Sequence, residues 1–293
     1  MSVTGEVENG TDGTDGTDGT DGTERYNFAG SAAFAVLAGA VLAWATRSGD
    51  VQLLIAVAAA QALLAVTWIY VLRVPGRIGG LVIAAMAATA CDVGTSVWPH
   101  SRLTVLLVAA GLAVPVMFVH QLLRGAARVR VGSSLGAIAL VVVGESSMAA
   151  LLQLRHEFPS GRVGADPTFA VIVAVMGALL AGYFTDMLLA SPRFDGSVPR
   201  GLPAVAVSTA VGAALGHLLL RDSLQFSGGR GAFVGAAVGV LAALLAIAIA
   251  YVEAGAPLAS EGFARRARPL LSVLMPLALI APAAFLLCTA ISA

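Results

Sequence analysis

The stretch that decides the fold is Val131 to Leu154, VGSSLGAIALVVVGESSMAALLQL, a run of 24 residues in which Glu145 is the only ionisable side chain. A helix rises about 1.5 Å per residue, so this run can cross the roughly 30 Å hydrocarbon core of a bilayer. A charge near the bilayer centre costs about 2.5–3.5 kcal/mol on insertion scales, so such residues are rare and often functional. The stretch therefore predicts a membrane-spanning helix, and Glu145 becomes the first candidate for function.

The whole chain has the composition of a membrane protein. Of its 293 residues, 58% are hydrophobic and 12% are charged, and the mean hydropathy is +0.88. An ordinary soluble domain carries about a quarter charged residues. The lipid bilayer is therefore the expected partner, and the fold class is an all-α, polytopic transmembrane helix bundle.

Apolar runs separated by short polar connections continue from Phe28 to the end of the chain. Since a span needs about 20 apolar residues, the sequence predicts nine spans, with eight as the nearest alternative. They are Phe28 to Thr46, Val51 to Leu72, Ile78 to Trp98, Leu103 to Leu123, Val131 to Leu154, Pro167 to Leu189, Leu202 to Leu220, Gly231 to Val252 and Pro269 to Ser292.

Two domains of different character follow from this pattern. Residues 1–27 are polar and repeat Thr-Asp-Gly four times between Thr11 and Gly22, a composition that cannot bury enough apolar surface to fold alone. We expect a disordered tail there. Residues 28–293 form the transmembrane helical domain, and its short connectors leave no room for a soluble domain.

Arginine placement predicts the orientation, because positively charged loops stay in the cytoplasm. Eleven arginines lie on the side of the N-terminus and six on the other side. We therefore expect a cell (plasma) membrane protein with its N-terminus in the cytoplasm and, with nine spans, its C-terminus outside.

The composition also excludes several classes of function. All 17 basic residues are arginine, so a retinal Schiff base or lysine-dependent covalent catalysis is excluded. A net charge of zero predicts no nucleic-acid partner. The two cysteines, Cys91 and Cys288, lack the spacing of a metal site or a disulfide framework. We expect no cofactor and no metal.

Depth along each span groups the other ionisable residues into two levels. Asp92 and Glu145 each lie about 14 residues from the cytoplasmic start of their spans, or about 21 Å. His217 reaches a similar height and could neutralise one of these carboxylates. His120 and Asp186 lie on descending spans, in the inner third of the membrane. All five are candidates for a proton or ion path.

Each of these residues also has a purely structural interpretation. A buried acid can be neutral and hydrogen-bonded to serine or to a backbone carbonyl, and Ser146 and Ser147 adjoin Glu145. His120 and Asp186 can instead extend to the cytoplasmic interface. Sequence leaves both interpretations open.

Glycines at intervals of four mark two spans for close packing. Gly212 and Gly216 lie on one, and Gly231, Gly235 and Gly239 lie on the next. Each set forms a flat stripe on one helix face, which lets two helices approach closely. The sequence predicts that these two spans form a tight pair.

Four short passages carry a resemblance to known sequences: Phe118 to Gly125 (FVHQLLRG), Leu152 to Phe158 (LQLRHEF), Pro192 to Asp195 (PRFD) and Val198 to Leu202 (VPRGL). Through them the chain resembles uncharacterised multi-pass integral membrane proteins of high-GC actinobacteria. The resemblance implies a source and a multi-pass topology, and it implies no chemistry.

Three functions are compatible with this pattern. The first is a small-solute or proton/ion-coupled transporter that uses the intramembrane carboxylates. The second is a non-catalytic scaffold or assembly partner in cell-envelope biogenesis, which would use the glycine-faced helices as its contact surface for a membrane protein or a second copy of this chain. The third is a membrane-embedded lipid-modifying enzyme, which would need a cytoplasmic metal site that the connectors do not offer. An enzyme is therefore not favoured, and we expect no catalytic residues.

Overall fold

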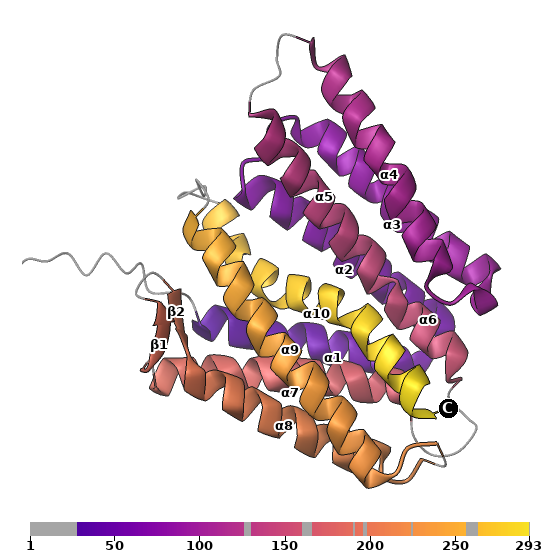
Figure 1. The fold of residues 1–293 in the computed structure, drawn as a ribbon, viewed down its shortest axis with the longest axis vertical. Helices are drawn as coiled ribbons and strands as arrows, with labels where there is room; N and C mark the ends of the chain where they lie inside the picture. Colours follow the sequence, from indigo (N-terminus) through magenta and orange to yellow (C-terminus); the bar gives the residue numbers. More distant parts are fainter. Residues whose placement is uncertain are drawn as a thin grey trace, which may run out of the picture.

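The computed structural model describes residues 28–125, 130–159, 166–189, 191–195, 198–223, 225–255 and 263–292. Within these residues, nine helical spans are long and apolar enough to cross a membrane, which confirms the predicted helix bundle. Figure 1 shows them as one assembly of long helices. The tail expected at residues 1–27 lies outside the described residues.

The elements follow one another with short connections. In chain order the helices are α1 (Phe28–Ser48), α2 (Asp50–Val71), α3 (Arg77–Val97), α4 (Thr104–Leu123), α5 (Val131–Met148), α6 (Ala150–Glu157), α7 (Pro167–Leu188), α8 (Leu202–Leu220), α9 (Gly228–Gly255) and α10 (Phe263–Ser292). A short 3-10 helix, η1 (Pro99–Ser101), follows α3. The strands β1 (Arg193–Asp195) and β2 (Val198–Gly201) pair antiparallel before α8.

The span that contains Glu145 is made of two helices. Helices α5 and α6 together cover Val131–Glu157, and the helix is interrupted at Ala149. The Ala149 N–H lies 3.4 Å from the Glu145 carbonyl oxygen, and the Ala149 carbonyl accepts both the Leu152 N–H at 3.0 Å, a three-residue bond, and the Gln153 N–H at 3.3 Å, a four-residue bond. The regular four-residue ladder therefore weakens one turn beyond Glu145.

Helix α10 lies at the centre of the bundle. It contacts α2, α5 and α6 on one side and α1, α7 and α9 on the other. In its most apolar window, 67% of the residues are buried inside the protein, more than in any other span among the described residues. The bundle thus has two groups of helices, α2 to α6 and α1 with α7 to α9, joined through α10.

A proline in α10 is compensated by a side chain from α7. Pro276 has no N–H, so the carbonyl of Ser272, four residues earlier, lacks its helical donor. The hydroxyl of Tyr183 donates to that carbonyl at 2.7 Å, and both residues are fully buried. This bond fixes α7 against the centre of α10.

The glycine stripes of α8 and α9 face each other, as the sequence predicts. A Cβ atom added at Gly235 would lie 2.8 Å from the carbonyl carbon of Gly212 and 2.9 Å from Cα of Gly216. One at Gly239 would lie 2.6 Å from the Ser208 carbonyl oxygen. The two backbones are in direct contact, so only glycine fits along this seam.

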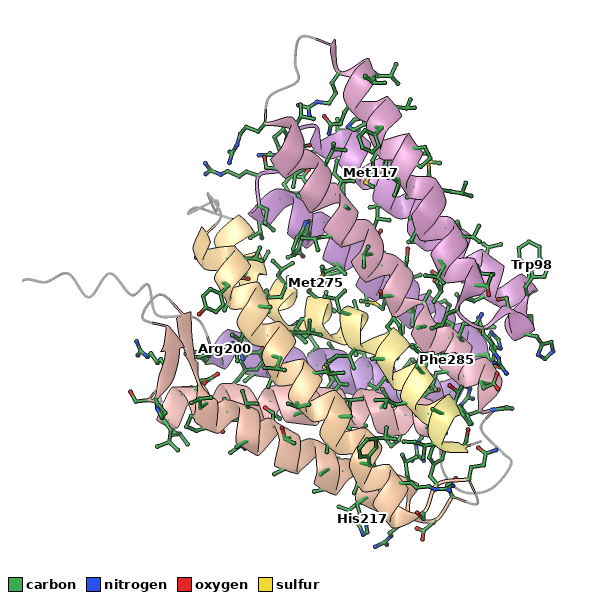
Figure 2. All side chains as sticks on the ribbon, in the orientation of Figure 1. Trp98, Met117, Arg200, His217, Met275 and Phe285 are labelled. Carbon is green, nitrogen blue, oxygen red and sulfur yellow. The ribbon has the colours of Figure 1, made fainter. Side chains whose placement is uncertain are left out.

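The bundle has two ends, which we name by their buried arginines. The Arg155 face carries the connections between α1 and α2, α3 and α4, α6 and α7, and α8 and α9. The Arg200 face carries the β-hairpin and the remaining connections. Figure 2 shows Arg200 at one end and His217 at the other.

Candidate functional site

A single amide links the two helices that carry Asp92 and Glu145. The Gln61 side chain, on α2, donates through Nε2 to Asp92 Oδ1 on α3 at 3.1 Å and to the main-chain carbonyl of Glu145 on α5, also at 3.1 Å. The two carboxyl groups are close enough to interact electrostatically. Helices α3 and α5 therefore bring the two acids to one place, and we call Gln61, Asp92 and Glu145 the carboxyl centre.

The carboxyl centre is shielded from solvent and has unused hydrogen-bonding capacity. Gln61 and Glu145 are each 1% exposed and Asp92 is 7% exposed. Among the described residues, Gln61 Oε1 and Glu145 Oε2 are buried acceptor atoms without a hydrogen-bond partner, and neither carboxyl forms a salt bridge. Buried acceptors of this kind usually have a donor, so these two oxygens are the atoms of the centre that can accept a further bond.

The interrupted span exposes the Glu145 carbonyl to Gln61. Because the bond from the Ala149 N–H is long, the Glu145 carbonyl can accept a second bond from outside its own helix. The hydroxyls of Thr95 and Ser96 donate instead to the main-chain carbonyl of Asp92. The backbone on both sides of the centre is thus held by side chains.

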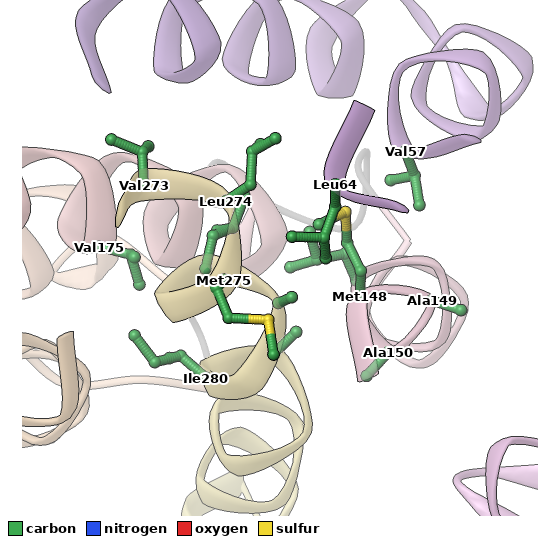
Figure 3. Packing of buried hydrophobic residues seen from close by; sticks show 14 of the residues in the cluster. Val57, Leu64, Met148, Ala149, Ala150, Val175, Val273, Leu274, Met275 and Ile280 are labelled. Atoms are coloured by element: carbon green, nitrogen blue, oxygen red, sulfur yellow. The ribbon is translucent and has the colours of Figure 1, made fainter. Parts of the chain in front are cut away.

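The carboxyl centre borders the apolar core. A Cβ atom added at Gly144 would lie 3.0 Å from the Met275 sulfur and 3.3 Å from a methyl carbon of Leu64. Figure 3 shows Met148 beside Leu64, with the Met275 side chain of α10 directed towards Met148. The interruption in the span therefore lies where α2, α5 and α10 pack together.

His120 and Asp186, expected on one level, are not brought together. The His120 ring packs on α3, where a Cβ at Gly79 would collide with it and a Cβ at Gly76 would lie 3.2 Å from Nε2. Asp186 has other partners: it accepts the Gly201 N–H at 3.0 Å, and Arg200 lies 3.5 Å from its second oxygen. Depth along a helix gives the level of a residue but not the direction of its side chain.

Arg200 organises a buried ionic cluster at its face. It is 2% exposed, and its guanidinium carbon lies 4.5 Å from the centroid of the Tyr183 ring. Glu253, on α9, interacts electrostatically with Arg200 and with Arg268 of α10. Asp186 thus belongs to a set of opposite charges that ties the β-hairpin to three helices.

His217 has no carboxylate of the centre as its partner. It is exposed, and its Nδ1 lies 3.0 Å from the carbonyl oxygen of Gly228. This bond closes the connection between α8 and α9 at the Arg155 face. The expectation that His217 neutralises Asp92 or Glu145 finds no contact among the described residues.

Two central residues were missing from the sequence-based candidates. Gln61 is a lone amide in the middle of an apolar run, the same signal that identified Glu145, although it carries no charge. Arg200 was counted only as one of the eleven arginines on the side of the N-terminus, because the sequence does not reveal that the hairpin folds it inward. Within the described residues, no group of three or more His, Cys, Asp or Glu side chains could hold a metal ion.

No protein-family model, no curated protein and no solved structure matches this chain.

Proposed function

We propose that this membrane protein is a small-solute transporter coupled to a cation, and that the carboxyl centre binds the coupling ion, either a proton or a small monovalent cation. One observation carries the proposal. The Gln61 amide donates both to the Asp92 carboxyl group and to the main-chain carbonyl of Glu145, neither of these two buried acids has a salt bridge among the described residues, and Gln61 Oε1 and Glu145 Oε2 have no donor there.

The energetics of burial explain why an ion belongs there. An ionised carboxylate in an apolar interior is costly unless it is paired, and two neighbouring carboxylates also repel each other. A proton or a cation relieves both costs at once. A centre that is stable only with its ion can couple the binding and release of that ion to a change of protein shape.

The position of the centre supports the same function. Transporters commonly place ion sites within the membrane beside interrupted helices, whose loosened carbonyls become available as ligands. Here the interruption at Ala149 follows Glu145 by one turn, and the Glu145 carbonyl already accepts a bond from another helix.

No specific observation favours the scaffold alternative. The five glycines that it would use as a contact surface are buried against one another within this chain. A scaffold would therefore need another surface for its partner.

Ion flux in liposomes tests the proposal. Purified protein is reconstituted with a pH-sensitive dye inside, the membrane potential is clamped, and an inward gradient of protons or of radioactive Na⁺ is imposed. We expect flux above that of protein-free liposomes, lost in Glu145→Gln and kept in Glu157→Gln, the same chemical change at an exposed residue of the same span. If the Glu145→Gln variant shows the same flux as the wild type, the proposal is contradicted.

A further inference from the structure

From the contacts of the short helix α6 we infer that it is a gate over the carboxyl centre, latched by Arg155. This inference rests on the proposed function, since a gate has meaning only where an ion or solute enters. It concerns residues of the Arg155 face, which differ from the residues of the ion-binding centre itself.

Arg155 holds together two segments that are distant in sequence. Its Nε lies 2.9 Å from Asp50 Oδ1 at the start of α2, and its Nη1 lies 2.6 Å from Asp166 Oδ2. The Arg155 side chain is 8% exposed. Because α2 belongs to one group of helices and α7 to the other, this arginine bridges the two groups at the Arg155 face.

Asp166 connects the latch to the start of α7. Its other oxygen, Oδ1, caps the helix by accepting the N–H groups of Thr168 at 3.0 Å and Phe169 at 3.2 Å. A helix cap of this kind stabilises the first turn. The carboxylate of Asp166 thus caps α7 through one oxygen and forms the salt bridge with Arg155 of α6 through the other.

A second polar contact holds α6 over α3. Gln153, which is 1% exposed, donates to the Ser101 hydroxyl on η1 at 3.4 Å. Since η1 directly follows α3, which carries Asp92, α6 closes the end of the bundle nearest to that acid. The two buried polar side chains of α6, Gln153 and Arg155, therefore both contact segments around the rim of the Arg155 face.

The interruption at Ala149 supplies the hinge. Ala149 and Ala150 are fully buried and small, and the neighbouring Met148 and Met275 have flexible side chains that can repack. The same interruption lies one turn from Glu145, whose carbonyl is held by Gln61. Movement of α6 about Ala149 would thus change the position of the Glu145 carbonyl in the carboxyl centre. In this structure the gate is closed.

The native thiol of Cys91 reports whether the gate opens. Cys91 is 0% exposed and adjoins Asp92. In a Cys288→Ala background, a small thiol reagent can react only with Cys91. Asp166→Asn keeps a capping side chain but removes the charge, and Arg155→Gln removes the latch from the other side. A loss of about 1.4 kcal/mol from the closed state raises the open population about tenfold.

We therefore expect both Arg155→Gln and Asp166→Asn to speed Cys91 labelling about tenfold or more. The control is Gly235→Ala, which loosens the distant α8 and α9 pair; it must not accelerate labelling at a temperature where all variants remain folded. Unchanged labelling in both latch variants, or equal acceleration in Gly235→Ala, overturns the gate. Accelerated labelling in the latch variants, together with ion flux that is insensitive to Glu145→Gln, would support the gate and refute the proposed function separately.

Discussion

The side-chain amide of Gln61 joins Asp92 to the main chain of Glu145, with a distance of 3.1 Å for each of its two hydrogen bonds. Both acceptors are oxygens, so only the NH₂ group can face them, and the orientation of the amide is fixed. Its own oxygen is consequently directed elsewhere and has no donor among the described residues.

Replacing Gln61 by methionine tests the structural part of this relationship. Methionine has a similar size but no N–H, so one buried carboxyl and one loosened carbonyl would lose their donor. We expect the free energy of unfolding to fall by about 1–3 kcal/mol. Thermal denaturation in detergent measures it, with Gln52→Met, at an exposed site on the same helix, as the control. Equal stability of the two variants would contradict the assigned bonds.

The bond between Tyr183 and Ser272 predicts a double-mutant coupling with Pro276. Tyr183→Phe removes the donor to the freed carbonyl and should cost about 1–3 kcal/mol. In a Pro276→Ala background, a backbone N–H can reach the Ser272 carbonyl, so Tyr183→Phe should cost less. Tyr251→Phe, at an exposed tyrosine, is the control. Additive effects of the two changes would show that the carbonyl does not link them.

The contact between α8 and α9 predicts strong sensitivity to a single methyl group. Gly235→Ala places a Cβ against the backbone of α8 and should lower stability by about 1–3 kcal/mol through overpacking. Gly136→Ala, where no atom lies within 4 Å of the added Cβ, should be neutral or slightly stabilising. If both alanines are tolerated equally, the close backbone contact is not present in the membrane.

The cluster at the Arg200 face predicts a large loss when its arginine is removed. Arg200→Gln leaves Asp186 buried without its ion-pair partner, and breaking a buried pair from one side costs about 3–5 kcal/mol. Arg221→Gln, whose side chain is 55% exposed, should change stability by less than about 1 kcal/mol. Melting temperatures of the two variants compare them directly, and similar values would refute the buried cluster.

Much of the fold follows from the sequence because one constraint dominates it. A chain in a bilayer must satisfy its backbone within each span, so apolar runs of sufficient length locate the helices from Phe28 to Ser292. Glycine spacing also predicts the tight pair of α8 and α9, because two glycine stripes can pack only where the backbones meet. These inferences depend on local pattern alone.

The candidate site depends on rotation about each helix axis, which depth does not give. Asp92 and Glu145 share a level and a place, whereas His120 and Asp186 share a predicted level but have separate partners. The apolar pattern also misses helix that extends beyond an apolar run: α10 begins at Phe263, whereas the apolar run predicted a start at Pro269. Gln61 became recognisable only when its two acceptors were known.

Equilibrium ion binding by the purified protein tests the central claim most directly, because it needs neither a known solute nor a transport cycle. Binding of radioactive Na⁺ and uptake of protons are measured for the wild type, Glu145→Gln and Glu157→Gln in detergent. The carboxyl centre predicts one saturable ion-binding event in the wild type and in Glu157→Gln that is absent in Glu145→Gln. Equal binding of both ions by all three proteins would contradict it.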